Sequence, residues 1–223
     1  MGEEVNMEAN RAFENIEKWL PDPSEVDGPN DIPVIRPVLD LPRLDSWTRF
    51  CSALQKPPTH STGVEFFTQD YQFQRVWLQP DRYLALLGKA GAVLSPDFSL
   101  YTDMPRAMQI YSHYRKHWCA AYWQQHGITV IPTIGWSDES SVAWCFDGEP
   151  VGSVVAVSSI GTQRQGSEAR RLFRYGYDAM MERLQPETVL FWGAIPAGCK
   201  GNICPVERFY KYDKNRRCGY DQN

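Results

Sequence analysis

Apolar residues gather in several short runs, each bounded by Gly, Pro, Ser or Asp. The runs lie at residues 64–67, 92–94, 128–134, 152–158 and 188–192. Continuous rather than alternating apolar runs are typical of strands covered on both faces, as in parallel sheets with helical crossovers. The pattern therefore predicts about five mainly parallel strands.

Helical periodicity occupies the intervals between these runs. It predicts helices over residues 80–87, 104–126, near 139–146, and from Gly166 and Ser167 to Leu184. The longest carries one apolar face for about six turns, formed by Ala107, Ile110, Tyr111, Tyr114, Trp118, Ala121 and Tyr122. His113 and His117 fall outside that face. Their i, i+4 spacing would let them reach one ion, but no zincin-type Glu lies between them, so we expect them to be exposed.

The alternation of strands and helices predicts an α/β fold of repeated βα units. Five strands are too few for a closed eight-stranded barrel, which leaves a partial barrel or an open wound sheet. Residues 32–197 would form this single domain. Three prolines between Ile32 and Leu44, Pro33, Pro37 and Pro42, predict an extended strap lying along it.

Both ends of the chain differ in composition from this central region. Residues 1–31 hold nine acidic and two basic residues, and predict an acidic helix over 7–20 followed by a Pro/Gly-rich linker. Residues 198–223 form a basic, Cys-containing tail. The net charge of −4 argues against duplex DNA as a partner. We also expect no membrane span and no secretory signal, and hence a cytoplasmic protein.

Six cysteines do not form a disulfide framework. Cys51, Cys119 and Cys145 lie in apolar or helical stretches and are predicted to be buried thiols. The tail spacing C-x4-C-x13-C places Cys199, Cys204 and Cys218 near one another. Three thiolates are one ligand short of a closed zinc site, so structural zinc is not expected there.

Candidate chemistry follows from the parallel strands, because ligands bind at their carboxyl ends. Asp70, Asp97 and Asp103 are the candidate catalytic residues, and they could divide acid and base roles or share a divalent cation. The candidate ligand-binding residues are Ser99, Tyr101, Arg106, Trp136, Asp138, Ser159 and Arg164. For Asp103 and Asp138 the competing interpretation is helix capping. The turn at 158–162 could bind a phosphate; the competing interpretation is that it is an ordinary strand-to-helix loop.

Four segments carry a resemblance to a known family: residues 65–83, 96–105, 122–136 and 145–150. The most specific is P-D-F-S-L-Y-T-D-M-P at 96–105. Together they resemble a family catalogued as a domain of unknown function, number 4417, over about residues 63–195. Members are common in phages, prophages and integrative elements, which implies a mobile-element origin and the host-cell cytoplasm, but no reaction. The resemblance marks Asp70, Asp97, Ser99, Tyr101, Asp103 and Trp136.

Two functions are compatible with the sequence. In the first, a strand-end pocket acts on a nucleotide or nucleic-acid-related ligand, with Tyr101 and Trp136 as an aromatic wall and Arg106 or Arg164 meeting a phosphate. In the second, the protein has no chemistry and blocks or redirects a host protein through its acidic N-terminal segment. The apolar face of the 7–20 helix would then fold back on its own domain or form a homodimer contact.

Overall fold

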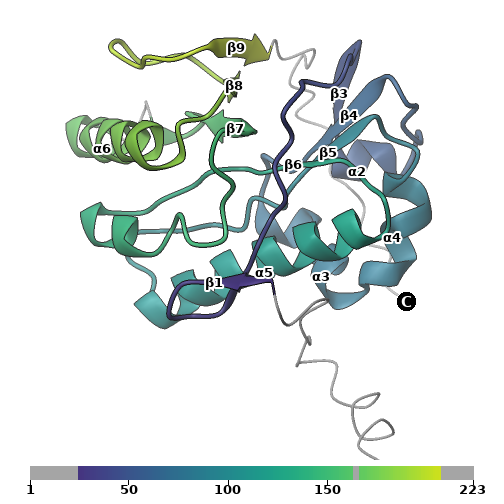
Figure 1. The fold of residues 1–223 in the computed structure, drawn as a ribbon, viewed down its shortest axis with the longest axis horizontal. Helices are drawn as coiled ribbons and strands as arrows, with labels where there is room; N and C mark the ends of the chain where they lie inside the picture. Colours follow the sequence, from purple (N-terminus) through teal and green to yellow (C-terminus); the bar gives the residue numbers. More distant parts are fainter. Residues whose placement is uncertain (1–24, 163–165, 207–223) are drawn as a thin grey trace, which may run out of the picture.

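The computed structural model describes residues 25–162 and 166–206 (Figure 1). One parallel sheet has the strand order β3 (Ser46–Arg49), β4 (Thr62–Glu65), β5 (Ala92–Leu94) and β6 (Val130–Ile131). A second parallel sheet has the strand order β7 (Val154–Ser158), β8 (Thr188–Trp192) and β9 (Ile203–Val206). Between the strands lie α2 (Phe50–Ala53), η1 (Asp70–Gln72), α3 (Arg75–Leu78), α4 (Pro80–Leu87), α5 (Arg106–Gln125), η2 (Glu139–Ala143) and α6 (Ser167–Leu184). The predicted α/β class with parallel strands is confirmed.

The two sheets form one curved layer. Just beyond β6, Thr133 makes a parallel bridge to Ala156 of β7, so the strand order continues from the first sheet into the second. The layer then curls. Four strands separate β3 from β8 in this order, yet the ring centroids of Trp47 on β3 and Trp192 on β8 are 5.0 Å apart. Of the two alternatives that the sequence left open, this curvature matches the partial barrel.

Side chains on the two faces of the layer enter different cores, as the alternation of strand residues requires. Val155, Val157, Val189 and Phe191 pack with Phe173, Tyr177 and Met180 of α6. Ala156, Leu190 and Trp192 point to the opposite face and join the larger core formed by β4–β6, α2, α3 and α5. Both faces are therefore covered, which explains why the strands read as unbroken apolar runs.

Two strands of the layer, β3 and β9, were not predicted, because they lie at its edges. β3 has the sequence Ser-Trp-Thr-Arg and all four residues are only partly buried. β9 contains Pro205, which an edge strand tolerates because one side of its backbone has no ladder to join. β9 also shows that part of the predicted C-terminal tail belongs to the sheet.

The expected exposure of two histidines on α5 is wrong. His113 and His117 are buried, at 1% and 0% exposure, whereas Tyr111 of the predicted apolar face is 44% exposed. The polar face packs beneath β2 (Ile32–Pro33) and the 144–150 segment, which supply hydrogen-bond acceptors. The aromatic face packs against Trp77 of α3, whose ring contacts those of Tyr111, Tyr114 and Trp118 edge-on.

The N-terminal part of the described chain is tied to this helix. β1 (Val26–Asp27) and β2 (Ile32–Pro33) form an antiparallel hairpin, so residues 25–31 are ordered rather than a free linker. The predicted strap then crosses the molecule toward β3 (Figure 1), with Ile35 buried and Val38 bonded to Ser153 and Val154. The predicted 7–20 helix lies outside the described residues. No helix in the described ranges has the length and apolarity required to cross a bilayer.

Candidate functional site

A cleft of about 2800 Å³ opens at the carboxyl ends of the parallel strands. Five of the predicted site residues line it: Asp97, Ser99, Tyr101, Asp103 and Trp136. They arrive from the loops after β5 and β6, while Phe67 follows β4 and Ser158 ends β7. The cleft therefore lies at the converging strand ends, which is where the sequence argument expects a ligand to bind.

Asp97 lies on the wall of this cleft, just after the end of β5, which is held firmly to β6. Ser95 and Thr133 lock the ends of β5 and β6 together, since their hydroxyl oxygens are 2.7 Å apart and the Thr133 backbone N–H donates to Ser95 Oγ at 2.8 Å. Two residues beyond these anchors stand Asp97 and Gly135, which face each other across the gap. The Asp97 carboxylate has no hydrogen-bond partner among the described residues and is only partly exposed.

The environment of Asp97 favours its neutral form. Burial raises the pKa of this carboxyl to about 7; Lys116 opposes the rise, while the nearby carboxylates of Asp70 and Glu65 add to it. Near neutral pH the group can therefore both give and accept a proton, the property expected of a general acid or base. Perturbed carboxyls in clefts are typical of functional sites.

Asp70 holds the loop that carries the other candidates. Its carboxylate accepts hydrogen bonds from the Ser99 backbone N–H at 3.1 Å and from the Ser99 hydroxyl at 2.7 Å. The same hydroxyl is 3.2 Å from the Tyr101 hydroxyl. Because its oxygens are engaged in this way and it lies beside the cleft rather than in its lining, Asp70 suits a positioning role better than the catalytic one first assigned to it.

Trp136 can occupy the cleft wall because the residue that it packs against, Gly176, has no side chain. Its indole N–H donates to the Leu172 carbonyl at 3.2 Å, and the ring lies against Gly176 of α6 so closely that a Cβ there would overlap it. It also packs on Phe173. α6 and the β6 loop can approach each other only because this position has no side chain.

Replacing that glycine is expected to displace the indole. Gly176→Ala should lower the free energy of unfolding by about 1–3 kcal/mol, the usual cost of overpacking, measured by urea denaturation. Glu182→Ala, an exposed change on the same helix, is the control and should change little. In a Trp136→Ala background the clash is absent, so Gly176→Ala should be neutral or slightly stabilising; an equal loss there would contradict the explanation.

The remaining predicted residues lie elsewhere or have other partners. Asp138 caps η2, accepting from the backbone N–H groups of Ser140 at 2.9 Å and Ser141 at 3.2 Å, and these bonds, with the Ser140 hydroxyl first, lower its pKa. Asp103 is exposed on the cleft rim; α5 begins behind Pro105 without a side-chain cap, so the capping interpretation is not observed. Arg106 is exposed and does not line the cleft. Arg164 lies outside the described residues.

The turn at 158–162 behaves as an ordinary loop. The buried Ser159 hydroxyl donates to the Ala194 carbonyl at 2.6 Å. The backbone N–H groups of Ile160 and Thr162 bond to Ser158 Oγ and to the Ser159 carbonyl. These three donors therefore already have partners, which favours the ordinary-loop interpretation.

Sequence analysis missed a charged pair inside the layer. Glu65 is 2% exposed and its carboxylate accepts from the Phe67 backbone N–H at 2.6 Å. Arg49, its register partner on β3, lies 3.6 Å away and lines the cleft. A Glu within an apolar strand was the available signal, because buried acids nearly always have a partner.

The cysteines of the tail do not converge within the described chain. Cys199 packs against the α6 core, whereas Cys204 of β9 packs against the larger core on the other face of the layer. Cys218 lies outside the described residues. The two described cysteines therefore do not face a common point.

The sequence matches one family model and two curated phage proteins. The family model described as "Domain of unknown function (DUF4417)" matches residues 24–211. The Gene 1 protein of Mycobacterium phage L5 is 42% identical over 157 residues, 70% of this chain and 68% of that protein. The Gene 1 protein of Mycobacterium phage D29 is 38% identical over 188 residues, 84% and 69% respectively. No solved structure shows significant similarity. The chain belongs to the DUF4417 family, which includes proteins encoded by phages.

Proposed function

We propose that the cleft binds a nucleotide or a nucleic-acid-related ligand and that Asp97 exchanges a proton with it. The observation that carries this proposal is the position of Asp97: a partly buried carboxyl without a hydrogen-bond partner among the described residues, on the wall of a large cleft at the strand ends. Asp103 on the rim is available for a second carboxylate role, and with Asp97 it could also hold a divalent cation carried in by a phosphate ligand.

Aromatic side chains around the cleft favour a planar ring. Tyr101 and Tyr71 are 61% and 45% exposed and line the cleft together with Trp136. Every nucleobase has a flat face that stacks on such rings. Arg49 and Lys56 also line the cleft and provide positive charge for a phosphate.

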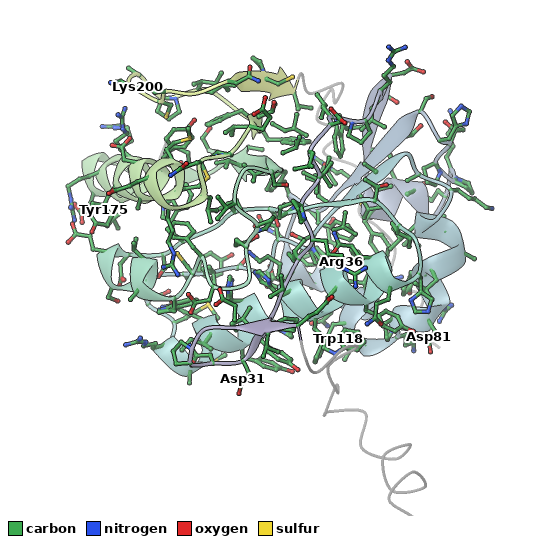
Figure 2. All side chains as sticks on the ribbon, in the orientation of Figure 1. Asp31, Arg36, Asp81, Trp118, Tyr175 and Lys200 are labelled. Carbon is green, nitrogen blue, oxygen red and sulfur yellow. The ribbon has the colours of Figure 1, made fainter. Side chains whose placement is uncertain are left out.

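The ligand class is tested on an exposed ring. Binding of the four ribonucleoside triphosphates and of a short single-stranded oligonucleotide is measured by calorimetry. Tyr101→Ala should weaken the tightest of these complexes by about 5- to 150-fold, the range for losing one base-stacking contact. Tyr175→Ala removes another exposed tyrosine ring, one that points outward from α6 (Figure 2), and should have no effect. Absence of binding to every probe, or equal losses in both variants, would refute the nucleotide proposal.

The second function, a protein-interaction factor docking through the acidic N-terminal segment, has its own test. Removal of residues 1–24 is the suitable deletion, because Asp27 accepts from the Gly148 backbone N–H and Glu25 pairs with Arg36. If that truncation abolishes function while Asp97→Asn leaves it intact, the interaction factor is the correct description and the cleft proposal falls.

A further inference from the structure

A cluster of buried polar side chains lies between α5 and the 144–150 segment, away from the cleft lining. It contains His113 and His117, one turn apart on α5, with Lys116 between them and Glu149 opposite. The four residues are at most 8% exposed. Burying so many polar groups costs free energy unless each has a partner, so their contacts need an explanation.

Backbone carbonyls fix the tautomers of both histidines. Nε2 of His113 lies 2.9 Å from the Asp147 carbonyl, and Nδ1 of His117 lies 2.8 Å from the Pro33 carbonyl. A carbonyl only accepts, so each of these nitrogens carries the proton. The other ring nitrogens, Nδ1 of His113 and Nε2 of His117, are then left with free lone pairs. Metal-binding histidines are typically held in this way, with the second N–H donated to a carbonyl.

Several of the remaining polar atoms in the cluster lack partners. Nδ1 of His113 and Oε2 of Glu149 are buried without a hydrogen bond, as is Oδ2 of Asp147 on the same segment. Nε2 of His117 lies 3.1 Å from Oε1 of Glu149, and when the imidazole is neutral with its proton on Nδ1, both of these atoms are acceptors that a cation would satisfy. Unsatisfied buried atoms of this kind point to a missing water or ion.

The spacing of these atoms fits one ion. One possible ligand atom from each of His113, His117 and Glu149 lies within 4.8 Å of the other two. Two ligands at about 2.0–2.2 Å from a zinc ion are separated by at most about twice that distance, so small side-chain rotations close the site. Lys116 bonds Oε1 of Glu149, which leaves Oε2 for the ion.

We propose that His113, His117 and Glu149 form a structural metal site for Zn²⁺ or a similar first-row divalent cation. Two neutral imidazoles and one carboxylate are a common ligand set for such ions, with water completing the coordination. The ion would join α5 to the 144–150 segment, and through Pro33 to the strap. The charge of Lys116 limits affinity, so we expect a site that a strong chelator empties.

The test uses the full-length protein, stripped with EDTA and dialysed against Zn²⁺. Elemental analysis should then give about one zinc per chain. At a free zinc concentration about 100 times Kd, the Tm should rise by about 5–10 °C. His117→Gln should weaken zinc binding by at least about 10- to 100-fold. His126→Gln, at an exposed histidine near the end of the same helix, should leave it unchanged.

Cobalt substitution of the unaltered protein avoids reliance on buried variants that fail to fold. Co²⁺ bound by imidazole and carboxylate gives visible ligand-field bands without a thiolate-to-metal charge-transfer band. A strong thiolate band would place the ion at cysteines and overturn the proposal. So would the absence of stoichiometric metal from the wild type, or equal affinity in His117→Gln. None of these outcomes depends on whether the cleft binds a nucleotide.

Discussion

Asp97→Asn is expected to make the protein more stable at pH 8, by about 2–4 kcal/mol. The cause is the cost of keeping a charged carboxylate in a largely desolvated position beside Asp70 and Glu65. Asparagine has nearly the same shape and no charge. The same substitution should abolish any proton transfer in the cleft. A residue that costs stability where it stands is what a functional site requires.

The stabilisation expected from Asp97→Asn depends on pH, and the two pKa values of Asp97 give its direction. The pKa of Asp97 is about 7 in the folded protein and near 3.8 when the chain is unfolded. Between these values the folded state holds a proton that the unfolded state has released, so this group's contribution to stability is lost as the pH rises from about 4 to 7. The difference in stability between Asp97→Asn and wild type should therefore be near zero at pH 4 and reach its full size above pH 7.

Urea denaturation of both proteins at several pH values measures this difference. Asp103→Asn is the matched control, because that side chain is exposed on the same cleft and its replacement should change the stability little. A constant difference for Asp97→Asn across pH 4–8, or a loss of stability at pH 8, would show that Asp97 is an ordinary ionised carboxylate, and the general acid-base role would have to be abandoned.

The fold was predictable where local pattern and tertiary environment agree. β5, β8 and α4 have the predicted bounds, because unbroken apolar runs and Pro and Gly at the helix ends are sufficient local signals. β3 and β9 were missed, because an edge strand needs few apolar residues. α5 was located correctly but its buried face was not, because the partners that make His113 and His117 tolerable come from residues 33 and 147–149.

For the candidate site, the sequence was sufficient to predict which residues lie together but not the role of each. Topology alone brings Asp97, Ser99, Tyr101 and Trp136 to one cleft, since parallel strands end at the same edge. It gives no information on which oxygens are already engaged, and so could not separate Asp97 from Asp70, which bonds Ser99, or from Asp138, which caps η2. The ion pair between Arg49 and Glu65 could not be predicted, because Arg49 lies on β3 and that strand was itself not predicted.

Lys116→Met is expected to cost about 3–5 kcal/mol, the range for breaking a buried ion pair from one side. Lys116 donates to Glu149 and, at 3.0 Å, to the Thr133 carbonyl, both buried. Although burial alone would raise the pKa of Glu149, the charge of Lys116 lowers it, so the carboxylate is charged and would be left without its cation. The Tm should fall by about 6–20 °C, measured with EDTA present so that no metal contributes.

A double-mutant cycle separates the charge from the packing. In Lys116→Met combined with Glu149→Gln no charge remains unpaired, and the new amide can donate to the free lone pair on Nε2 of His117, so most of the loss should be recovered. Arg36→Met removes the cation of an exposed pair with Glu25 and should cost no more than about 1 kcal/mol. If the two buried changes were simply additive, Lys116 would contribute by packing alone, and the charged state assigned to Glu149 would be wrong.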